Sequence, residues 1–209
     1  GETLRACADA IVQHFDVALA RIWTLATGGS VLDPQASAGM YTHADGASGR
    51  VQVGSSKIGE IARSSEAHIT SNLLDDLEAG DRDWARQNGV VAFAGYPLIC
   101  NGRVLGVLAV FSRSALSEAH TAALQSVAEV LGQAIDRKRQ EEAAISHASE
   151  IIRLARIAAE IPDGPESRPD LRSILSQIAS LASRAPELAA YSAGFAVPNP
   201  SSSDGAVSS

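Results

Sequence analysis

Residues 95–113, GYPLICNGRVLGVLAVFSR, decide the fold because they place a tight turn between two apolar runs. The turn is Asn101-Gly102, and both residue types tolerate the positive φ angles that a two-residue type I′ turn requires. We therefore expect Tyr96–Cys100 and Arg103–Phe111 to pair as antiparallel strands. The second run is apolar or glycine almost throughout, which predicts a strand in the middle of the sheet with both faces buried.

Composition limits the partners of this chain. The 209 residues, 45% of them hydrophobic, suffice for one compact domain with an appendage or for two small domains. The formal net charge is −7 and there is no basic block, so nucleic acid is not an expected partner. A membrane-spanning helix needs about 20 consecutive apolar residues, and no such run occurs, so no membrane partner is expected either.

The start of the chain and its cysteines indicate a reducing compartment. The first residues lack the basic start and apolar core of a signal peptide, so the expected location is cytoplasmic. Cys7 and Cys100 lie far apart in apolar stretches, and we expect two buried free thiols rather than a disulfide.

Periodicity and turn residues predict the other elements. Apolar residues at helical spacing predict an amphipathic helix over residues 3–15. Ser117 and Glu118 are typical of a helix N-terminus, and a long helix is expected to begin there. Between them we expect, in chain order, strands at 16–26 and 31–40, a loop at 42–54, a helix at 57–66, a short strand at 67–72, an irregular stretch at 73–80, a helix at 81–89 and the hairpin at 90–113.

The long helix carries a heptad-like apolar seam, interrupted by Lys138 and Glu141. Residues 118–135 also suit a helix that packs on its own sheet, whereas the seam continues over 143–160, where the sheet has ended. We therefore expect a two-stranded parallel coiled coil and a homodimer through helices. The predicted dimer seam is Leu124, Val127, Leu131, Ile145, Ala148, Ile152 and Ala155.

A second partner for the same seam lies later in the chain. Residues 161–169, IPDGPESRP, break the helix, and apolar spacing over 171–181 predicts another amphipathic helix. If that helix folds back on the seam, the chain is a monomer.

The order of elements resembles a GAF domain over residues 3–140. The hairpin and the following LSEAHTAALQSVAEVLGQAIDRKRQ, residues 116–140, look like the closing hairpin and exit helix of that family. HITSNLLDDLEAGDRDWARQNGV, residues 68–90, is similar to its middle region, although Gly80-Asp81 stands where family members often carry Asp-Pro. The resemblance implies an α+β fold. In it, a central antiparallel sheet has the N- and C-terminal helices on one face and short helices and loops on the other.

The expected domain organisation follows from these elements. Residues 1–136 form the GAF-like sensory domain, and 137–161 form a helical coiled-coil linker. Residues 162–209 contain the proline-broken amphipathic helix and a disordered tail. This last segment also resembles the start of a second GAF-like repeat, and a plain helical tail is the alternative.

The resemblance also implies a function. GAF domains serve as sensory or regulatory modules of larger bacterial signalling proteins, where a small ligand under the short helices biases the exit helix. The elements that surround the implied cavity supply the ligand-binding candidates, Tyr41, His68, Trp84, Phe93 and Tyr96. Ordinary core packing is the alternative for each of them. A module that binds no ligand and only dimerises is the alternative for the whole segment, and the cofactor is unknown.

More specialised chemistry finds little support in the sequence. Some GAF sensors bind haem through a histidine, but His68 is better explained as structural, and no Cys or His pair has metal-ligand spacing. His147 resembles the phosphoacceptor of a histidine kinase, yet Ala148 follows it where an acidic residue is usual, so a surface helix position is preferred.

Catalysis by this segment is not expected. The candidate carboxylates are explained by turns and helix starts; they are Asp75, Asp76, Asp81 and Asp83.

Overall fold

The computed structural model describes residues 2–40, 49–77 and 79–159, together with the single residues 173, 177 and 180. The chain divides into two compact units, Gly1–Arg137 and Lys138–Ser209. In chain order the elements are α1 (Glu2–Phe15), β1 (Leu19–Leu25), β2 (Val31–Gly39), β3 (Val51–Gln52), α2 (Ser56–Ser64), β4 (His68–Thr70), α3 (Leu73–Asp76), α4 (Ala79–Gln87), β5 (Ala92–Cys100), β6 (Arg103–Ser112) and α5 (Glu118–Ala159).

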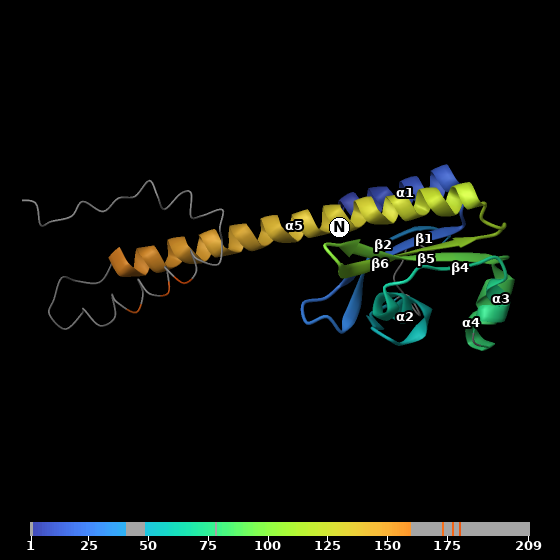
Figure 1. Cartoon of the computed structure of the whole chain (residues 1–209), viewed down its shortest axis with the longest axis horizontal. Coiled ribbons are helices and arrows are strands. Elements are labelled where there is room, and N and C mark those ends of the chain that lie inside the picture. Colours follow the sequence, from blue (N-terminus) through green and yellow to red (C-terminus); the bar gives the residue numbers. More distant parts are fainter. Residues whose placement is uncertain are drawn as a thin grey trace, which may run out of the picture. The chain divides into compact units, whose positions relative to one another are not determined.

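The first unit is built on a six-stranded antiparallel sheet with the order β3-β2-β1-β6-β5-β4 (Figure 1). The apolar run of the hairpin forms β6, which lies between β1 and β5. Its positions from Leu105 to Val110 are all buried. Helices cover both faces of the sheet, so a strand at its centre meets apolar side chains on either side. This confirms the prediction of a doubly buried central strand.

The hairpin turn is confirmed at Asn101-Gly102, where φ is 51° at the first residue and 73° at the second. Residues Ala92–Cys100 pair with Arg103–Ser112, which extends the predicted pairing by several residues away from the turn. Gly106 lets β1 approach closely, because a Cβ atom there would lie 2.1 Å from the Trp23 carbonyl oxygen.

The two faces of the sheet carry different helices (Figure 1). One face, here called the α5 face, lies under α1 and α5 and contains Ile22, Tyr96 and Leu108. The other, here called the α2 face, lies under α2, α3 and α4 and contains Trp23 and Phe93. This arrangement confirms the expected α+β fold with terminal helices on one face and short helices on the other.

Two short elements differ from the sequence prediction. The predicted loop 42–54 contains β3, a two-residue edge strand that pairs with the first residues of β2, and residues 41–48 lie outside the described part of the chain. The predicted irregular stretch 73–80 contains the single turn of α3. Both elements are shorter than the window over which apolar periodicity can be recognised.

The ends of the predicted helices are well defined by their caps. The backbone N–H of His120 donates to Ser117 Oγ at 3.2 Å, which confirms Ser117 as the N-cap of α5. Gly89, with φ of 66°, follows α4 as expected for a residue that ends a helix.

The dimer seam predicted along α5 needs a correction in its first part. Leu124 and Leu131 are buried, with 0% and 4% exposure, because they pack on the sheet of their own domain. Val127 is half-buried against the same core. Leu124 and Leu131 therefore stabilise the domain and cannot form the seam, and Val127 contributes to the same core.

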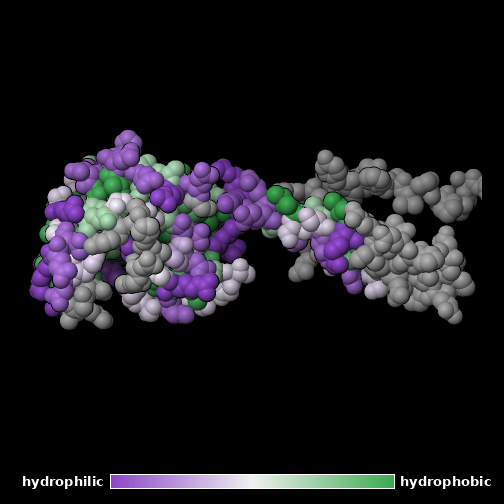
Figure 2. Space-filling view, turned by 180° about the vertical axis from the view of Figure 1, so that it is seen from behind, coloured by the Kyte–Doolittle hydropathy of each residue, from purple (hydrophilic) through white to green (hydrophobic). Residues whose placement is uncertain are grey.

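The later seam residues differ from the first ones. Ile145 and Ile152 are exposed by 67% and 63%, and Ala148 is half-buried. Figure 2 shows hydrophobic residues on the surface of this later part of α5. The side chain of Ala155 lies outside the described residues, as do the predicted segments 161–169 and 171–181 apart from three single positions. No helix within the described residues is both long and apolar enough to cross a membrane.

Candidate functional site

A row of neighbouring residues crosses the α2 face from β2 to β4. Strand register places Arg21 of β1 between Ser37 and Ala109, then Gly95 beside Ala109, and His68 beside Gly95. Directly paired residues point to the same side of a sheet, so all five share the α2 face. The row therefore has a basic side chain toward each end and two small residues between them.

The small residues of this row receive α2. A Cβ atom at Gly95 would lie 2.3 Å from Ile61 Cδ1 and 2.8 Å from the Phe93 ring. Ile61 is 2% exposed, so its side chain packs in the space that the missing Cβ leaves. Gly95 is thus the point at which α2 rests on the sheet.

An aromatic row runs beside the small residues. The Phe93 and Phe111 rings lie 5.1 Å apart, centroid to centroid, in edge-to-face geometry. Trp84 of α4 meets Phe111 at 5.7 Å, and His68 lies 6.0 Å from Phe93. Such pairs stabilise the packing of α4 on the sheet and of the edge strand β4 beside β5, beyond the contribution of the apolar area that they bury.

A polar cluster joins three elements at the β4 edge. His68 Nε2 lies 2.7 Å from Asp76 Oδ2, and Lys57 Nζ lies 3.3 Å from the same oxygen. An ionised carboxylate only accepts hydrogen bonds. In this contact, Nε2 of His68 is therefore the protonated ring nitrogen, and its N–H donates a hydrogen bond to Asp76. The carboxylate thereby links β4, α2 and α3.

The cluster also sets the charge state of its carboxylate. The hydrogen bond from His68, assisted by Lys57, holds the pKa of Asp76 below its usual value, although partial desolvation opposes this shift. His68 and Lys57 both favour the ionised form of Asp76. The three side chains are partly exposed, with relative side-chain exposures of 25% to 39%, so the cluster stands at the surface of the α2 face.

Arg21 is the charged member of the row on the other side. Its Nε donates to Ser37 Oγ at 3.2 Å. Burial lowers the pKa of Arg21, because a guanidinium loses hydration beside apolar neighbours. The structure thus holds a half-buried cation on the α2 face.

The structure brings together three of the five residues predicted to bind a ligand. His68, Trp84 and Phe93 meet on the α2 face through the aromatic row. Tyr96 lies on the α5 face, where its hydroxyl donates to the Thr121 carbonyl of α5 at 2.9 Å, so its placement with the others is wrong. Tyr41 lies outside the described residues.

Sequence reasoning missed Arg21, Lys57 and Gly95. Side chains alternate across a strand, so Phe93 and Tyr96, three positions apart in one strand, must point to opposite faces. The same parity in β1 puts Arg21 on one face with Trp23, and opposite Ile22. The signal was therefore present in the predicted strands.

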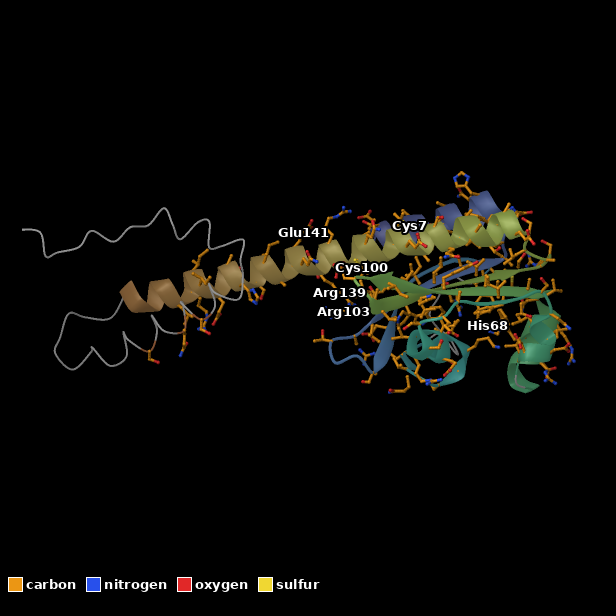
Figure 3. The ribbon with its side chains drawn as sticks, viewed as in Figure 1. Cys7, His68, Cys100, Arg103, Arg139 and Glu141 are labelled. Atoms are coloured by element: carbon orange, nitrogen blue, oxygen red, sulfur yellow. The ribbon has the colours of Figure 1, made fainter. Side chains whose placement is uncertain are left out.

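The cysteines are free and lie away from this site. Cys7 and Cys100 are half-buried against the core of the α5 face, and Figure 3 shows both on the side opposite His68. Burial and the nearby Asp136 carboxylate raise the pKa of the Cys100 thiol. Among the described residues, no three His, Cys, Asp or Glu side chains are grouped so that they could hold a metal ion.

Comparison with solved structures shows the same fold. The GAF domain region of a putative membrane protein from Geobacter sulfurreducens PCA is 23% identical, with a TM-score of 0.56 over 65% of this chain and 91% of that one. The GAF domain of an Acinetobacter phosphoenolpyruvate-protein phosphotransferase is 18% identical, with a TM-score of 0.53 over 66% and 82% of the two chains.

An enzyme also shares the fold. A type II free methionine-R-sulfoxide reductase from Thermoplasma acidophilum is 13% identical, with a TM-score of 0.53 over 65% of this chain and 92% of that one. A search of curated proteins finds no match. The GAF domain family model matches residues 1–136, which is well over half of the sequence. The chain therefore belongs to the GAF domain family.

Proposed function

We propose that this chain is a non-catalytic sensory or regulatory module of a larger bacterial signalling protein. A small molecule binds on the α2 face and shifts α2, β4 and α3 between two arrangements. The exit helix α5 passes this bias to an output domain, and two copies associate through it. A ligand acts in this way only when it has unequal affinity for the two arrangements.

The observation that carries this proposal is the difference in side-chain chemistry between the two faces of the sheet. The α5 face is an apolar core under two long helices, which suits a rigid support. The α2 face combines apolar and aromatic side chains with a few polar groups, Arg21, Lys57 and His68. Ligand sites favour this mixture of apolar walls and few polar groups.

Strand β5 offers a physical link between the faces. Gly95 receives the Ile61 side chain of α2, and the next residue, Tyr96, hydrogen-bonds Thr121 in the first turns of α5. A displacement of α2 that moves β5 therefore acts on a strand that is tied to the exit helix. This juxtaposition supports transmission through α5.

A ligand screen with the full chain tests the proposal. Candidate classes are amino acids, aromatic acids, cyclic nucleotides and haem, and a compound that binds only the folded state raises the melting temperature. We expect a binder to slow hydrogen exchange in residues 56–76 and to change exchange in α5. A binder that protects only α1 and α5, or the absence of any binder, contradicts the proposal.

A purely structural module is the second candidate, and one observation favours it. Ile61 already occupies the space over Gly95, so part of the α2 face is filled by the protein itself. A structural module needs no ligand and only has to hold its copies together. A screen without binders, combined with a stable dimer, would favour this candidate over the sensor.

A further inference from the structure

Arg21 stands among buried apolar side chains on the α2 face. Its neighbours along β1 on that face are Leu19 and Trp23, which are 0% and 2% exposed. Across the strands it is paired with Ala109, which is fully buried, and with Ser37. A guanidinium in such surroundings costs free energy unless an acceptor compensates for its lost hydration.

The compensation within the described structure is small. Ser37 Oγ, a neutral oxygen, accepts from Nε of Arg21. The part of the chain whose side chains the structure describes gives Arg21 no carboxylate partner, although exposed arginines do have one. These exposed, paired arginines are Arg50, Arg63, Arg86 and Arg153. Carboxylate partners therefore occur at these exposed arginines, while within the described residues the two terminal amino groups of the half-buried Arg21 have no carboxylate partner.

We propose that Arg21 binds the carboxylate of a small ligand that has a compact apolar body. The inference rests on the proposed function and names the ligand chemistry of that same face. With Nε held by Ser37, the two terminal amino groups form a planar fork that fits the two oxygens of a carboxylate.

The surroundings also restrict the body of the ligand. Leu19, Trp23 and Ala109 provide apolar contacts, and their near-complete burial leaves little room. The space over Gly95, which follows Ala109 in the row, is filled by Ile61. A ligand that reaches from Arg21 across Ala109 toward Gly95 therefore has about two strand spacings, close to 10 Å, before it meets α2. A single ring or a short branched chain fits this length.

Matched pairs of acids and amides test the charge requirement. The probes are sodium acetate, isobutyrate and benzoate, each compared with its amide at equal ionic strength, with the full chain and thermal shift plus calorimetry as readouts. We expect isobutyrate or benzoate to raise the melting temperature with dose, and the amides to have no effect. Arg21→Gln should weaken binding about tenfold or more, as expected for the loss of a charged hydrogen-bonding partner.

Two further variants separate geometry from charge. Arg21→Lys keeps the charge but loses the fork, so it should bind more weakly than wild type and more strongly than Arg21→Gln. Arg63→Gln removes the same charge from the exposed side of α2 and should leave binding unchanged. If Arg21→Gln does not fold, the decision rests on Arg21→Lys and on the Arg21 Nε–H signal in a nitrogen-edited NMR spectrum. That signal should move with benzoate and not with benzamide.

The outcomes distinguish this inference from the proposed function. Equal binding of the acid by wild type and Arg21→Gln overturns the inference. Binding of only neutral or cationic compounds in the wider screen also overturns it, but leaves the sensory function standing. If no compound of any class binds, both proposals fail.

Discussion

At the residue scale, the hairpin turn depends on backbone conformation alone. Gly102 has φ of 73°, and an added Cβ would meet no atom within 4 Å, so steric overlap contributes nothing to a substitution there. We expect Gly102→Val to lower the free energy of unfolding by about 1 kcal/mol or more, because β-branching disfavours the left-handed region. Urea denaturation monitored by circular dichroism measures this loss.

Gly102→Asn is the matched control for that substitution. Asparagine tolerates the left-handed region, so its cost should be clearly smaller than that of valine. Equal costs for the two variants would show that something other than φ makes glycine necessary at this turn.

Tyr96 links the sheet to the exit helix through one buried hydroxyl. Its hydrogen bond to the Thr121 carbonyl is 2.9 Å long, and burial raises the pKa of Tyr96 to about 12. We expect Tyr96→Phe to cost about 1 kcal/mol at neutral pH, the usual net contribution of one hydrogen bond.

The same residue predicts a dependence on alkaline pH. The folded-state pKa lies above the unfolded value of about 10, so the contribution of the neutral phenol is complete below pH 10 and is lost as the pH rises toward 12. Chemical denaturation from pH 8 to 11.5 should therefore show wild type losing stability relative to Tyr96→Phe. Parallel pH profiles for the two proteins would contradict the assignment.

Local signals and the alternation of side chains along a strand determine which single-residue features the sequence could predict. The turn was predictable because Asn-Gly is a strong local signal, and positive φ at both positions confirms it. Phe93 and Tyr96 were grouped from their place in one segment, although alternation separates them. The hydrogen-bond partners of His68 were not predictable, because they come from helices distant in sequence.

At the scale of elements, α2 is held on the sheet by one close contact. Gly95→Ala would place Cβ 2.3 Å from Ile61 Cδ1, so the helix or the side chain must move. We expect a cost of about 1–3 kcal/mol, typical of overpacking. Ile61→Val removes Cδ1, and the extra cost of Gly95→Ala should fall in that background by about 0.5 kcal/mol or more. A double-mutant cycle from urea denaturation measures the coupling.

Gly106→Ala provides the contrast for this cycle. Its Cβ would lie 2.1 Å from the backbone oxygen of Trp23, which no side-chain truncation can move away. Ile61→Val should therefore give Gly106→Ala no relief. If both alanine variants respond alike to Ile61→Val, the contact between α2 and Gly95 is not what limits position 95.

Long elements were predictable and very short ones were not. Helix α1 and the start of α5 follow from apolar spacing and an N-cap, signals that extend over several turns. Strand β3 and helix α3 have two and four residues, and their pairing depends on tertiary neighbours. The predicted dimer seam of α5 was wrong at Leu124 and Leu131 for a related reason. A stripe at heptad spacing marks a helix that packs on a sheet as readily as a coiled coil.

At the scale of the whole molecule, both faces of one sheet are covered by separate sets of helices. The strands between them carry residues that act on both sides, as Gly95 and Tyr96 do at consecutive positions of β5. In the proposed mechanism, such shared strands connect a ligand on the α2 face to α5. The Tyr96→Phe variant therefore also tests the proposed function. It should weaken the response of α5 to a bound ligand more than it weakens binding itself.

We also propose that the exit helix determines whether the chain associates. Leu124 and Leu131 are buried in their own domain, so a dimer through the predicted seam would use the later residues Ile145 and Ile152, which are 67% and 63% exposed. Exposed apolar residues at a heptad spacing on one helix usually pack against a partner. We expect light scattering to find a dimer for wild type and a monomer for Ile145→Asp combined with Ile152→Asp.

Charge alone must be separated from position in this last test. Ala143→Asp combined with Ser146→Asp adds the same charge at two exposed positions on other sides of the same helix, and this variant should remain a dimer. A monomeric wild type rejects the dimer outright. A dimer that survives both isoleucine substitutions places the interface elsewhere, and Val130, which is 64% exposed on α5, is then the next position to change. Because Leu124 and Leu131 face their own sheet, their substitution would test folding rather than association.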